Sequence, residues 1–218
     1  MKTLKPLFVI ILFLAVSASQ AYAVTKEKKY KPLSKIVIVP LDGVTNTEIY
    51  NYKMLFWDCL GSYFVNVPMA DDITIDKRQR LPKSCLNYNK TRYDANKVLK
   101  YLSAHAPKNT VVIGVTNKDI SCRLHGRKDW GIFGLANKPG NACIVSTHRI
   151  REKSSNTYVV MVHEFLHSRG VPHCPDKECV MQDFKGKAKF EPFICDRCIN
   201  IALGRKLGAP CKNTRICF

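Results

Sequence analysis

The sequence predicts an α+β fold in which helices pack against a twisted, mixed β-sheet. The first half of the 218-residue chain alternates short β-branched runs with segments that place apolar residues at helical spacing. The second half continues with further short strands and then with a long helix that is apolar enough to lie inside the molecule. This order of elements favours a mixed sheet covered by helices, followed by a small C-terminal lobe.

Each strand is predicted from a β-branched or alternating composition. These segments are 35–40, 64–69, 110–116, 130–136 and 142–147. The run 110–116 has the strongest pattern and is expected to be buried on both faces. The stretches 71–89 and 117–128 are predicted to be irregular, and Pro139 with Gly140 to form a turn.

Helices are predicted where apolar side chains recur on one face. These segments are 47–61, 93–106, 152–169 and 192–207. The first is expected to be capped near Asn46 or Thr47 and to end at Gly61. Gly170 ends the third, because glycine most easily supplies the positive φ that follows a helix.

The first 23 residues have the features of a secretory signal peptide. Lys2 and Lys5 form a short basic region, and 7–16 is an unbroken apolar run that is too short to span a bilayer comfortably. The segment 21–23 has the small-x-small pattern that signal peptidase accepts, which predicts cleavage after Ala23. Cleavage implies a secreted or periplasmic protein without stable membrane insertion, and the alternative is an uncleaved N-terminal anchor.

Residues 24–218 are expected to form a single domain with two lobes. The upper lobe, 24–170, would hold the sheet and the third helix, and the lower lobe, 171–218, is rich in cysteine. The net charge of +18 is spread along the chain, and no nucleic-acid-binding motif accompanies it. We therefore expect a monomer with a solvated basic surface and no nucleic-acid partner, with attraction to anionic polymers or membranes as the alternative.

One stretch of the third predicted helix has the spacing of a catalytic zinc site. His163 and His167 are four residues apart, so their imidazoles project from one face of the helix and can share a zinc ion. Gly170 permits a sharp turn, after which His173 returns as a third ligand. Three histidines leave a fourth position open for water, which distinguishes a catalytic zinc from a closed structural one.

Glu164 follows the first histidine and is placed to act on water rather than to bind the metal. The predicted chemistry is peptide-bond hydrolysis by a zinc-bound water, with Glu164 as the general base that takes its proton. The expected substrate is therefore a peptide or a protein. Two alternatives stay open: a non-catalytic zinc-binding or interaction protein on the same scaffold, and a basic, disulfide-rich binding protein in which the motif is accidental.

Four cysteines next to this stretch predict a second, structural zinc site. They form two pairs, Cys174 with Cys179 and Cys195 with Cys198, whose spacing suits a closed tetrahedral ion. We therefore expect two zinc ions per chain. Two disulfides are the competing interpretation, because the protein is expected to be exported. The other six cysteines suggest three disulfides, paired in sequence order as Cys59–Cys85, Cys122–Cys143 and Cys211–Cys217.

The stretch from His163 to Cys198 resembles the archaemetzincin family of zinc metallopeptidases, which belongs to the metzincin clan. The resemblance rests on the long histidine motif joined directly to Cys174, on the later cysteines and on Met181. It implies a metzincin-like fold, in which Met181 lies in the turn beneath the catalytic zinc. It also implies that the strand containing Gly131, Phe133 and Gly134 borders the cleft and binds an extended peptide.

Overall fold

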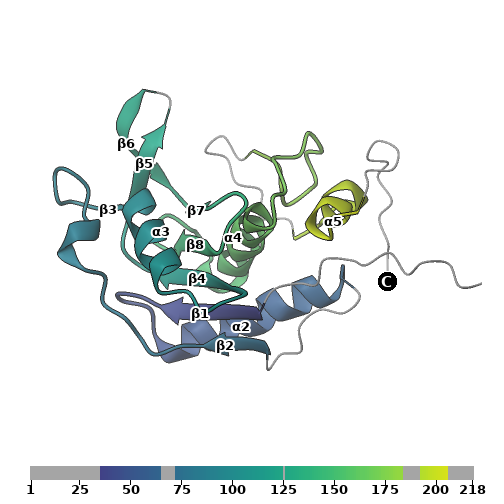
Figure 1. The fold of residues 1–218 in the computed structure, drawn as a ribbon, viewed down its shortest axis with the longest axis horizontal. Helices are drawn as coiled ribbons and strands as arrows, with labels where there is room; N and C mark the ends of the chain where they lie inside the picture. The colour runs from purple at the N-terminus through teal and green to yellow at the C-terminus, as the bar shows by residue number, and fades with distance from the viewer. Residues whose placement is uncertain (1–34, 65–71, 125, 184–191, 206–218) are drawn as a thin grey trace, which may run out of the picture. The chain divides into compact units, whose positions relative to one another are not determined.

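A five-stranded mixed sheet forms the centre of the described part of the chain. The computed structural model describes residues 35–64, 72–124, 126–183 and 192–205, which all belong to one compact unit. The strand order is β2-β1-β4-β8-β7 (Figure 1). In chain order these strands are β1 (Lys35–Pro40), β2 (Ile73–Ile75), β4 (Thr110–Thr116), β7 (Gly134–Ala136) and β8 (Ala142–Ser146).

Four strands of this sheet run parallel, and β7 is an antiparallel strand at its edge. β1 pairs with β2 and β4, and β4 pairs with β8, all in parallel. β7 pairs antiparallel with β8, which places Gly134 opposite Val145. All seven residues of β4 are buried, as its β-branched run predicted.

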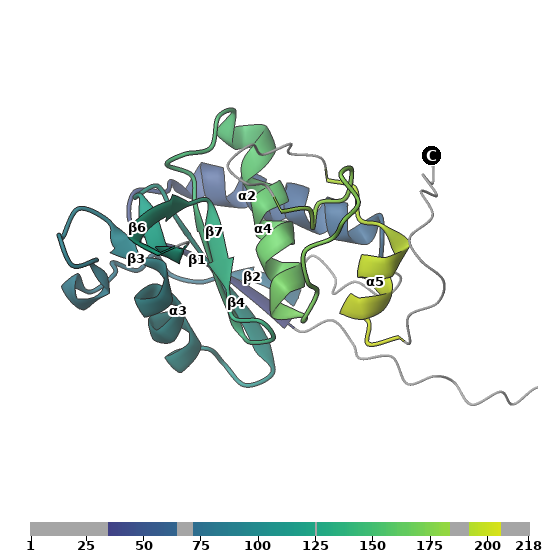
Figure 2. The same cartoon turned by 90° about the horizontal axis from the view of Figure 1, so that it is seen from above.

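Successive residues of the strands face two separate hydrophobic cores. Ile113 of β4 belongs to the core that contains α2 (Asn46–Gly61) and α4 (Lys153–Ser168). Val112, its neighbour, belongs to the core that contains α3 (Ala95–Ala104). Figure 2 shows the strands between α2 and α3, with α4 beside α2. The zinc-motif helix α4 therefore packs against the sheet and also against α2, which lies beside it on the same face.

The ends of α2 and α3 are fixed by side chains. Thr45 caps α2: Thr45 Oγ1 accepts from the amide of Glu48 at 3.2 Å, and Glu48 Oε2 accepts from the amide of Thr45 at 2.8 Å. The cap therefore lies one or two residues before the predicted Asn46 or Thr47. Asp94 caps α3, which begins two residues later than predicted because Tyr93 and Asp94 form a short strand.

A second, three-stranded sheet corrects the sequence prediction. It contains β3 (Tyr93–Asp94), β5 (Ile120–Leu124) and β6 (Arg127–Ile132), in the order β3-β5-β6. The prediction of an irregular segment at 117–128 was wrong, and the single strand at 130–136 is divided between β6 and β7. These strands are short and partly exposed, so pairing in the tertiary structure decides them more than composition does.

Two further predictions differ in their extent. The last helix, α5, spans Asp196–Ala202 and is shorter than the predicted 192–207. β2 and the 3-10 helix η3 (Lys83–Cys85) lie in the stretch 71–89 that was predicted to be irregular. The predicted strand 64–69 lies outside the described residues except for Phe64. The predicted signal peptide 1–23 lies wholly outside them. Within the described ranges, no helix has the length and apolar character needed to cross a bilayer.

Candidate metal centres

Three histidines from α4 and the turn after it bring their imidazole rings together. His163 and His167 are one helical turn apart, and their ring centroids are 4.6 Å apart. The ring of His173 lies 4.8 Å from that of His167 and 5.5 Å from that of His163. One potential ligand atom from each residue lies within 4.8 Å of the others, so a single metal ion can contact all three.

The turn at Gly170 brings the third histidine back toward the helix. Gly170 has a φ of +90°, in the region that favours glycine. Its amide donates to the carbonyl of His167 at 2.8 Å, and the amide of Val171 donates to that of Leu166 at 3.0 Å. These bonds satisfy carbonyls that the end of α4 leaves open, and they reverse the chain as predicted.

Two backbone carbonyls fix the tautomers of the helical histidines. His163 Nδ1 lies 2.7 Å from the carbonyl oxygen of Val180, and His167 Nδ1 lies 2.7 Å from that of Val171. A carbonyl only accepts, so each Nδ1 carries the hydrogen and each Nε2 carries the lone pair that binds a metal. Burial lowers the pKa of His163 to about 3 and that of His167 to about 4, which keeps both rings neutral at pH 7. This donor set fits zinc.

Glu164 is buried between the histidine-bearing helix and the edge strand. Its side chain is 6% exposed, and burial raises the pKa of its carboxyl group to about 8. A Cβ built on Gly134 of β7 would lie 2.7 Å from both Cγ and Oε1 of Glu164. The thiol of Cys143 on β8 donates to the backbone carbonyl of Glu164 at 3.2 Å. The carboxyl group is thus held at the edge of the sheet, next to the first histidine.

Two charged residues outside the motif lie near the histidines. Burial and Lys138 lower the pKa of His173, whereas Asp183 raises it. Lys138 also lowers the pKa of His163 and His167, after the larger effect of burial. Sequence reasoning missed Lys138, because only the packing of its loop places it here: the amide of Gly140 donates to the carbonyl of Ser168 at 3.0 Å.

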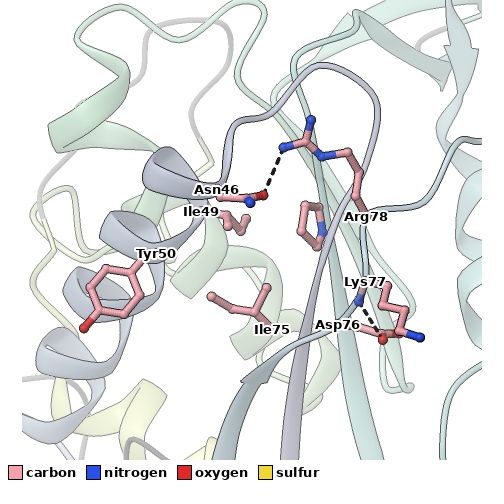
Figure 3. Close-up of a pocket in the computed structure, with 8 residues that line it drawn as sticks. Asn46, Ile49, Tyr50, Ile75, Asp76, Lys77 and Arg78 are labelled. Carbon is pink, nitrogen blue, oxygen red and sulfur yellow. Dashed lines mark hydrogen bonds between the residues drawn. The ribbon is translucent and has the colours of Figure 1, made fainter.

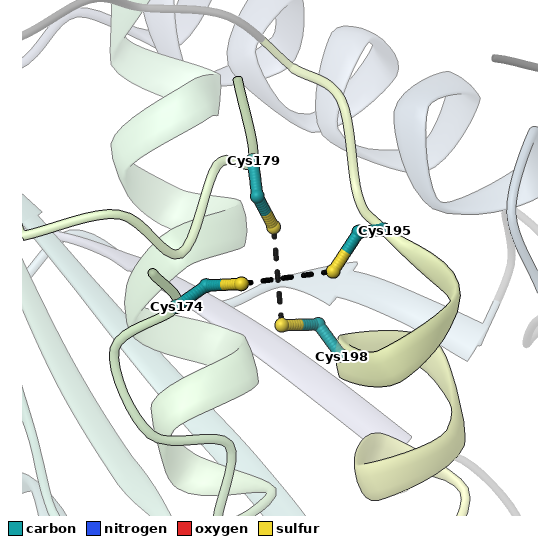
Figure 4. Close-up of side chains that lie close together, drawn as sticks. All are labelled: Cys174, Cys179, Cys195 and Cys198. Carbon is teal, nitrogen blue, oxygen red and sulfur yellow. Dashed lines mark hydrogen bonds between the residues drawn. The ribbon is translucent and has the colours of Figure 1, made fainter. Parts of the chain in front are cut away.

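Four cysteine sulfurs converge at a second centre (Figure 4). The sulfurs of Cys174 and Cys195 are 3.7 Å apart, and those of Cys179 and Cys198 are 3.8 Å apart. Two sulfurs bound tetrahedrally to one zinc ion at about 2.3 Å lie about 3.8 Å apart, whereas disulfide sulfurs lie about 2.05 Å apart. All four ligand atoms lie within 4.8 Å of one another, so the arrangement fits a tetrahedral ion and not two disulfides.

One turn of the chain contacts both the histidine centre and the cysteine centre. Met181 is fully buried, and its carbonyl accepts from the amide of Cys174 at 2.7 Å. It lies in a turn that the amide of Gln182 closes by donating to the carbonyl of Cys179 at 2.9 Å. Val180, next to it, holds His163.

Comparison with known proteins identifies the family. No protein-family model matches the chain. The archaemetzincin of Saccharolobus solfataricus is 31% identical over 162 residues, which cover 67% of this chain and 79% of that protein. The chain belongs to the archaemetzincin family. The archaemetzincin of Methanopyrus kandleri is 29% identical over 133 residues, which cover 57% of this chain and 74% of the relative.

Solved structures of this family and its neighbours share the fold. The crystal structure of the Methanopyrus kandleri archaemetzincin superimposes with a TM-score of 0.63 at 24% identity, over 78% of this chain and 93% of that one. A zinc-dependent peptidase from Methanocorpusculum labreanum gives a TM-score of 0.62 at 18% identity, over 77% and 99% of the two chains. The metzincin-like fold is therefore confirmed, and this archaemetzincin is a zinc metallopeptidase.

The three residues expected at the archaemetzincin substrate edge lie in different places. Gly134 is on β7, against Glu164. Phe133 precedes β7, and its carbonyl accepts from the amide of Ser146 at 2.8 Å. Gly131 lies in β6 of the smaller sheet, against the guanidinium of Arg149, and so not in the same strand as Gly134.

The disulfide predictions for this archaemetzincin also need correction. The predicted pairs Cys59–Cys85 and Cys122–Cys143 are wrong, since all four thiols are free and buried. Cys59 and Cys85 belong to the two cores on opposite faces of the sheet. Cys143 lies on β8 and Cys122 on β5 of the other sheet, so neither pair can form a bond. The pair Cys211–Cys217 lies outside the described residues.

A hollow at the far edge of the sheet contains no part of either centre. It lies beside β2, between the start of α2 and the segment after β2 (Figure 3). Arg78 Nη2 donates to Asn46 Oδ1 across it at 3.1 Å. The lining residues are Pro40, Asn46, Ile49, Tyr50, Ile75, Asp76, Lys77 and Arg78. Because β2 and β7 are opposite edges, this hollow is remote from Glu164.

Proposed function

We propose that His163, His167 and His173 hold the catalytic zinc of this metallopeptidase and that Glu164 is the general base of peptide-bond hydrolysis. The observation that carries the proposal is the position of Glu164: a buried carboxyl group that follows the first of three converging imidazoles. Zinc bound there supplies a Lewis acid that activates water and polarises the scissile carbonyl.

Glu164 moves the proton in this reaction. Its carboxylate takes a proton from the attacking water and returns it to the nitrogen of the leaving amine. Burial raises the pKa of the Glu164 carboxyl group in the metal-free protein, and the positive charge of a zinc ion at the histidines would favour the carboxylate form that accepts the proton. The bonds from Val180 and Val171 to the two helical histidines hold the rings still during the transfer.

We propose that the substrate is an extended peptide or protein segment bound along β7. β7 forms an edge of the described five-stranded sheet, and an edge strand offers backbone groups for strand addition. Gly134 brings this edge against Glu164, so a peptide paired there would pass the histidine cluster. Strand addition along β7 would position the backbone of the substrate and would not select a particular substrate side chain.

We propose that Cys174, Cys179, Cys195 and Cys198 hold a second, structural zinc. The sulfur spacing of 3.7 and 3.8 Å supports this assignment. Metal analysis of protein purified without chelator should find two zinc ions per chain. A count of one would remove one of the two assignments, and a count of zero would remove both.

We propose that the protein is exported, with cleavage after Ala23, and that it acts as a monomer. The basic region, apolar run and cleavage pattern of the first 23 residues support export. N-terminal sequencing of the protein recovered outside the producing cytoplasm should begin at Val24. A protein that keeps its Met1 in the membrane fraction would contradict cleavage.

The substitution Glu164→Gln tests the proposed reaction. The variant should keep its two zinc ions and lose about 10²–10⁴-fold in kcat/KM on peptides, because it retains the shape but not the base. Glu152→Gln is the matched control, since Glu152 is exposed at the start of α4 and should change little. Undiminished cleavage by Glu164→Gln would refute the role of Glu164.

A broad peptide library should be assayed with the wild-type protein at several pH values. Cleavage should depend on zinc and be lost after chelation. A wild-type protein that holds two zinc ions yet cleaves no sequence would favour a non-catalytic zinc-binding role on the same scaffold.

A further inference from the structure

The four-cysteine centre and the histidine centre are joined by adjacent residues at two points. His173 is followed directly by Cys174, so the third histidine and the first cysteine share a peptide bond. Val180 follows Cys179 directly, and its carbonyl accepts from Nδ1 of His163. The segment 174–180 therefore begins and ends at contacts that serve both centres.

The carbonyl of Val180 is positioned by the cysteine lobe and not by α4. The amide of Val180 donates to the carbonyl of Phe193 at 2.6 Å. This bond fixes the backbone of Val180 to the segment that leads into Cys195. The amide of Cys174 donates to the carbonyl of Met181 at 2.7 Å, which closes the segment on itself. His163 thus receives its hydrogen-bond partner from Val180, the residue directly after the loop that joins the two ligands Cys174 and Cys179.

A second connection runs from the end of α4 to α5. Arg169 Nη2 donates to the carbonyl of Ala202 at 3.3 Å, and Arg169 is only 8% exposed. α5 carries Cys198 in its first turn, with Cys195 at its N-cap. Loss of the sulfur cluster would release α5 and the loop together, and with them the support of His163 and His173.

We propose that the four-cysteine centre is a positioning device for the histidine centre, so that filling the cysteine cluster raises the zinc affinity of the histidine cluster. This inference rests on the proposed function, in which both clusters bind zinc. Groups that orient a metal-bound histidine typically change metal affinity by about 10–100-fold. By linkage, zinc at the histidines must raise the zinc affinity of the cysteines by the same factor.

The first test empties the cysteine centre by substitution. In Cys198→Ser, the zinc affinity of the histidine centre, measured by native mass spectrometry with a competing chelator, should fall about 10–100-fold. Cys198→His keeps four ligands and should restore most of that affinity. Cys85→Ser is the matched control, because it removes a buried thiol from the core on the other face of the sheet. Unchanged affinity in a folded Cys198→Ser protein would overturn the proposal.

The second test changes the histidine centre and leaves all four cysteines intact. In His167→Ala, the affinity of the cysteine centre for cobalt, followed by thiolate-to-cobalt charge-transfer absorption, should fall relative to the wild-type protein by the same factor as in the first test. Equal affinities would show independent centres and overturn the coupling, even where Cys198→Ser fails to fold. A wild-type protein with one zinc ion would overturn the coupling by removing one of the two zinc sites, whereas a protein with none would refute both zinc assignments of the proposed function.

Discussion

Gly134 on the edge strand β7 lies directly against the carboxyl group of Glu164 on α4. A Cβ at residue 134 would lie 2.7 Å from Cγ and Oε1 of Glu164, which is closer than packed atoms approach. The absence of a side chain at Gly134 lets the edge strand that we propose binds peptide lie directly against the proposed general base. The two residues are 30 positions apart, so the sheet and not the motif brings them together.

Gly134→Ala should therefore reduce activity while leaving the metal in place. The new methyl group displaces the carboxyl group of Glu164, and a displacement of about 1 Å from productive geometry costs about 100-fold in rate. Steady-state kinetics and zinc content should be measured together. Gly61→Ala is the matched control, because its Cβ would meet nothing within 4 Å at the end of α2. Full activity of Gly134→Ala would contradict the close contact between residue 134 and the carboxyl group of Glu164.

Gly170→Ala should destabilise the protein and weaken zinc binding at the histidines. At a φ of +90°, an alanine strains the backbone by about 1–2 kcal/mol, which shifts the turn that returns His173. Gly126→Ala provides the same kind of strain in the turn between β5 and β6, where φ is +75° and the new Cβ would meet no side chain or backbone beyond its chain neighbours within 4 Å. Chemical denaturation should show a loss of stability in both variants, whereas only Gly170→Ala should lose zinc affinity.

The joint contribution of His163, His167 and Glu164 to the stability of the zinc-free protein should pass through a maximum near pH 6.5. The lowered pKa values of His163 and His167, about 3 and 4, stabilise the folded state above 6.5, and this contribution is lost as the pH falls toward them. Glu164 acts in the opposite sense. Its raised pKa of about 8 stabilises the folded state below 4.5, and this contribution is lost as the pH rises to 8.

Denaturation of chelator-treated protein between pH 4 and 8.5 measures this profile. Below 6.5 the two histidines outweigh the single glutamate, so the joint contribution of these three groups rises with pH; above 6.5 only the glutamate among them titrates, so their contribution falls. Glu164→Gln should abolish the fall above 6.5 and keep the rise below it. Wild-type and Glu164→Gln profiles that run parallel between pH 6.5 and 8 would show that Glu164 has an ordinary pKa.

Lys138→Met should change the preference for charged substrates. Lys138 is exposed on the loop after β7, and its positive charge reaches all three histidines. An acidic side chain next to the scissile bond would be attracted to this ammonium group. The ratio of kcat/KM for acidic over neutral peptides should fall several-fold in Lys138→Met. Lys53→Met, on the helix α2, provides the charge-matched control.

The sequence by itself determined the three longer helices, α2, α3 and α4, and the identity of the candidate ligands. The β-branched run of β4 and the apolar face of α3 depend on local composition, and the structure has both. The spacing of His163 and His167 sets their common face on any helix, because it follows from 3.6 residues per turn. Gly170 similarly signals the turn through its own backbone freedom.

Only the tertiary structure decided how the remaining parts meet. The short strands β5 and β6 form because they pair with each other, and composition alone does not reveal a partner. The sulfur separations of 3.7 and 3.8 Å, which favour a metal over two disulfides at the cysteines, cannot be read from spacing along the chain. The contacts of Glu164 with Gly134 and of His163 with Val180 join residues 30 and 17 positions apart. Such contacts arise from packing of the whole domain. They position the side chains that the sequence motif identifies.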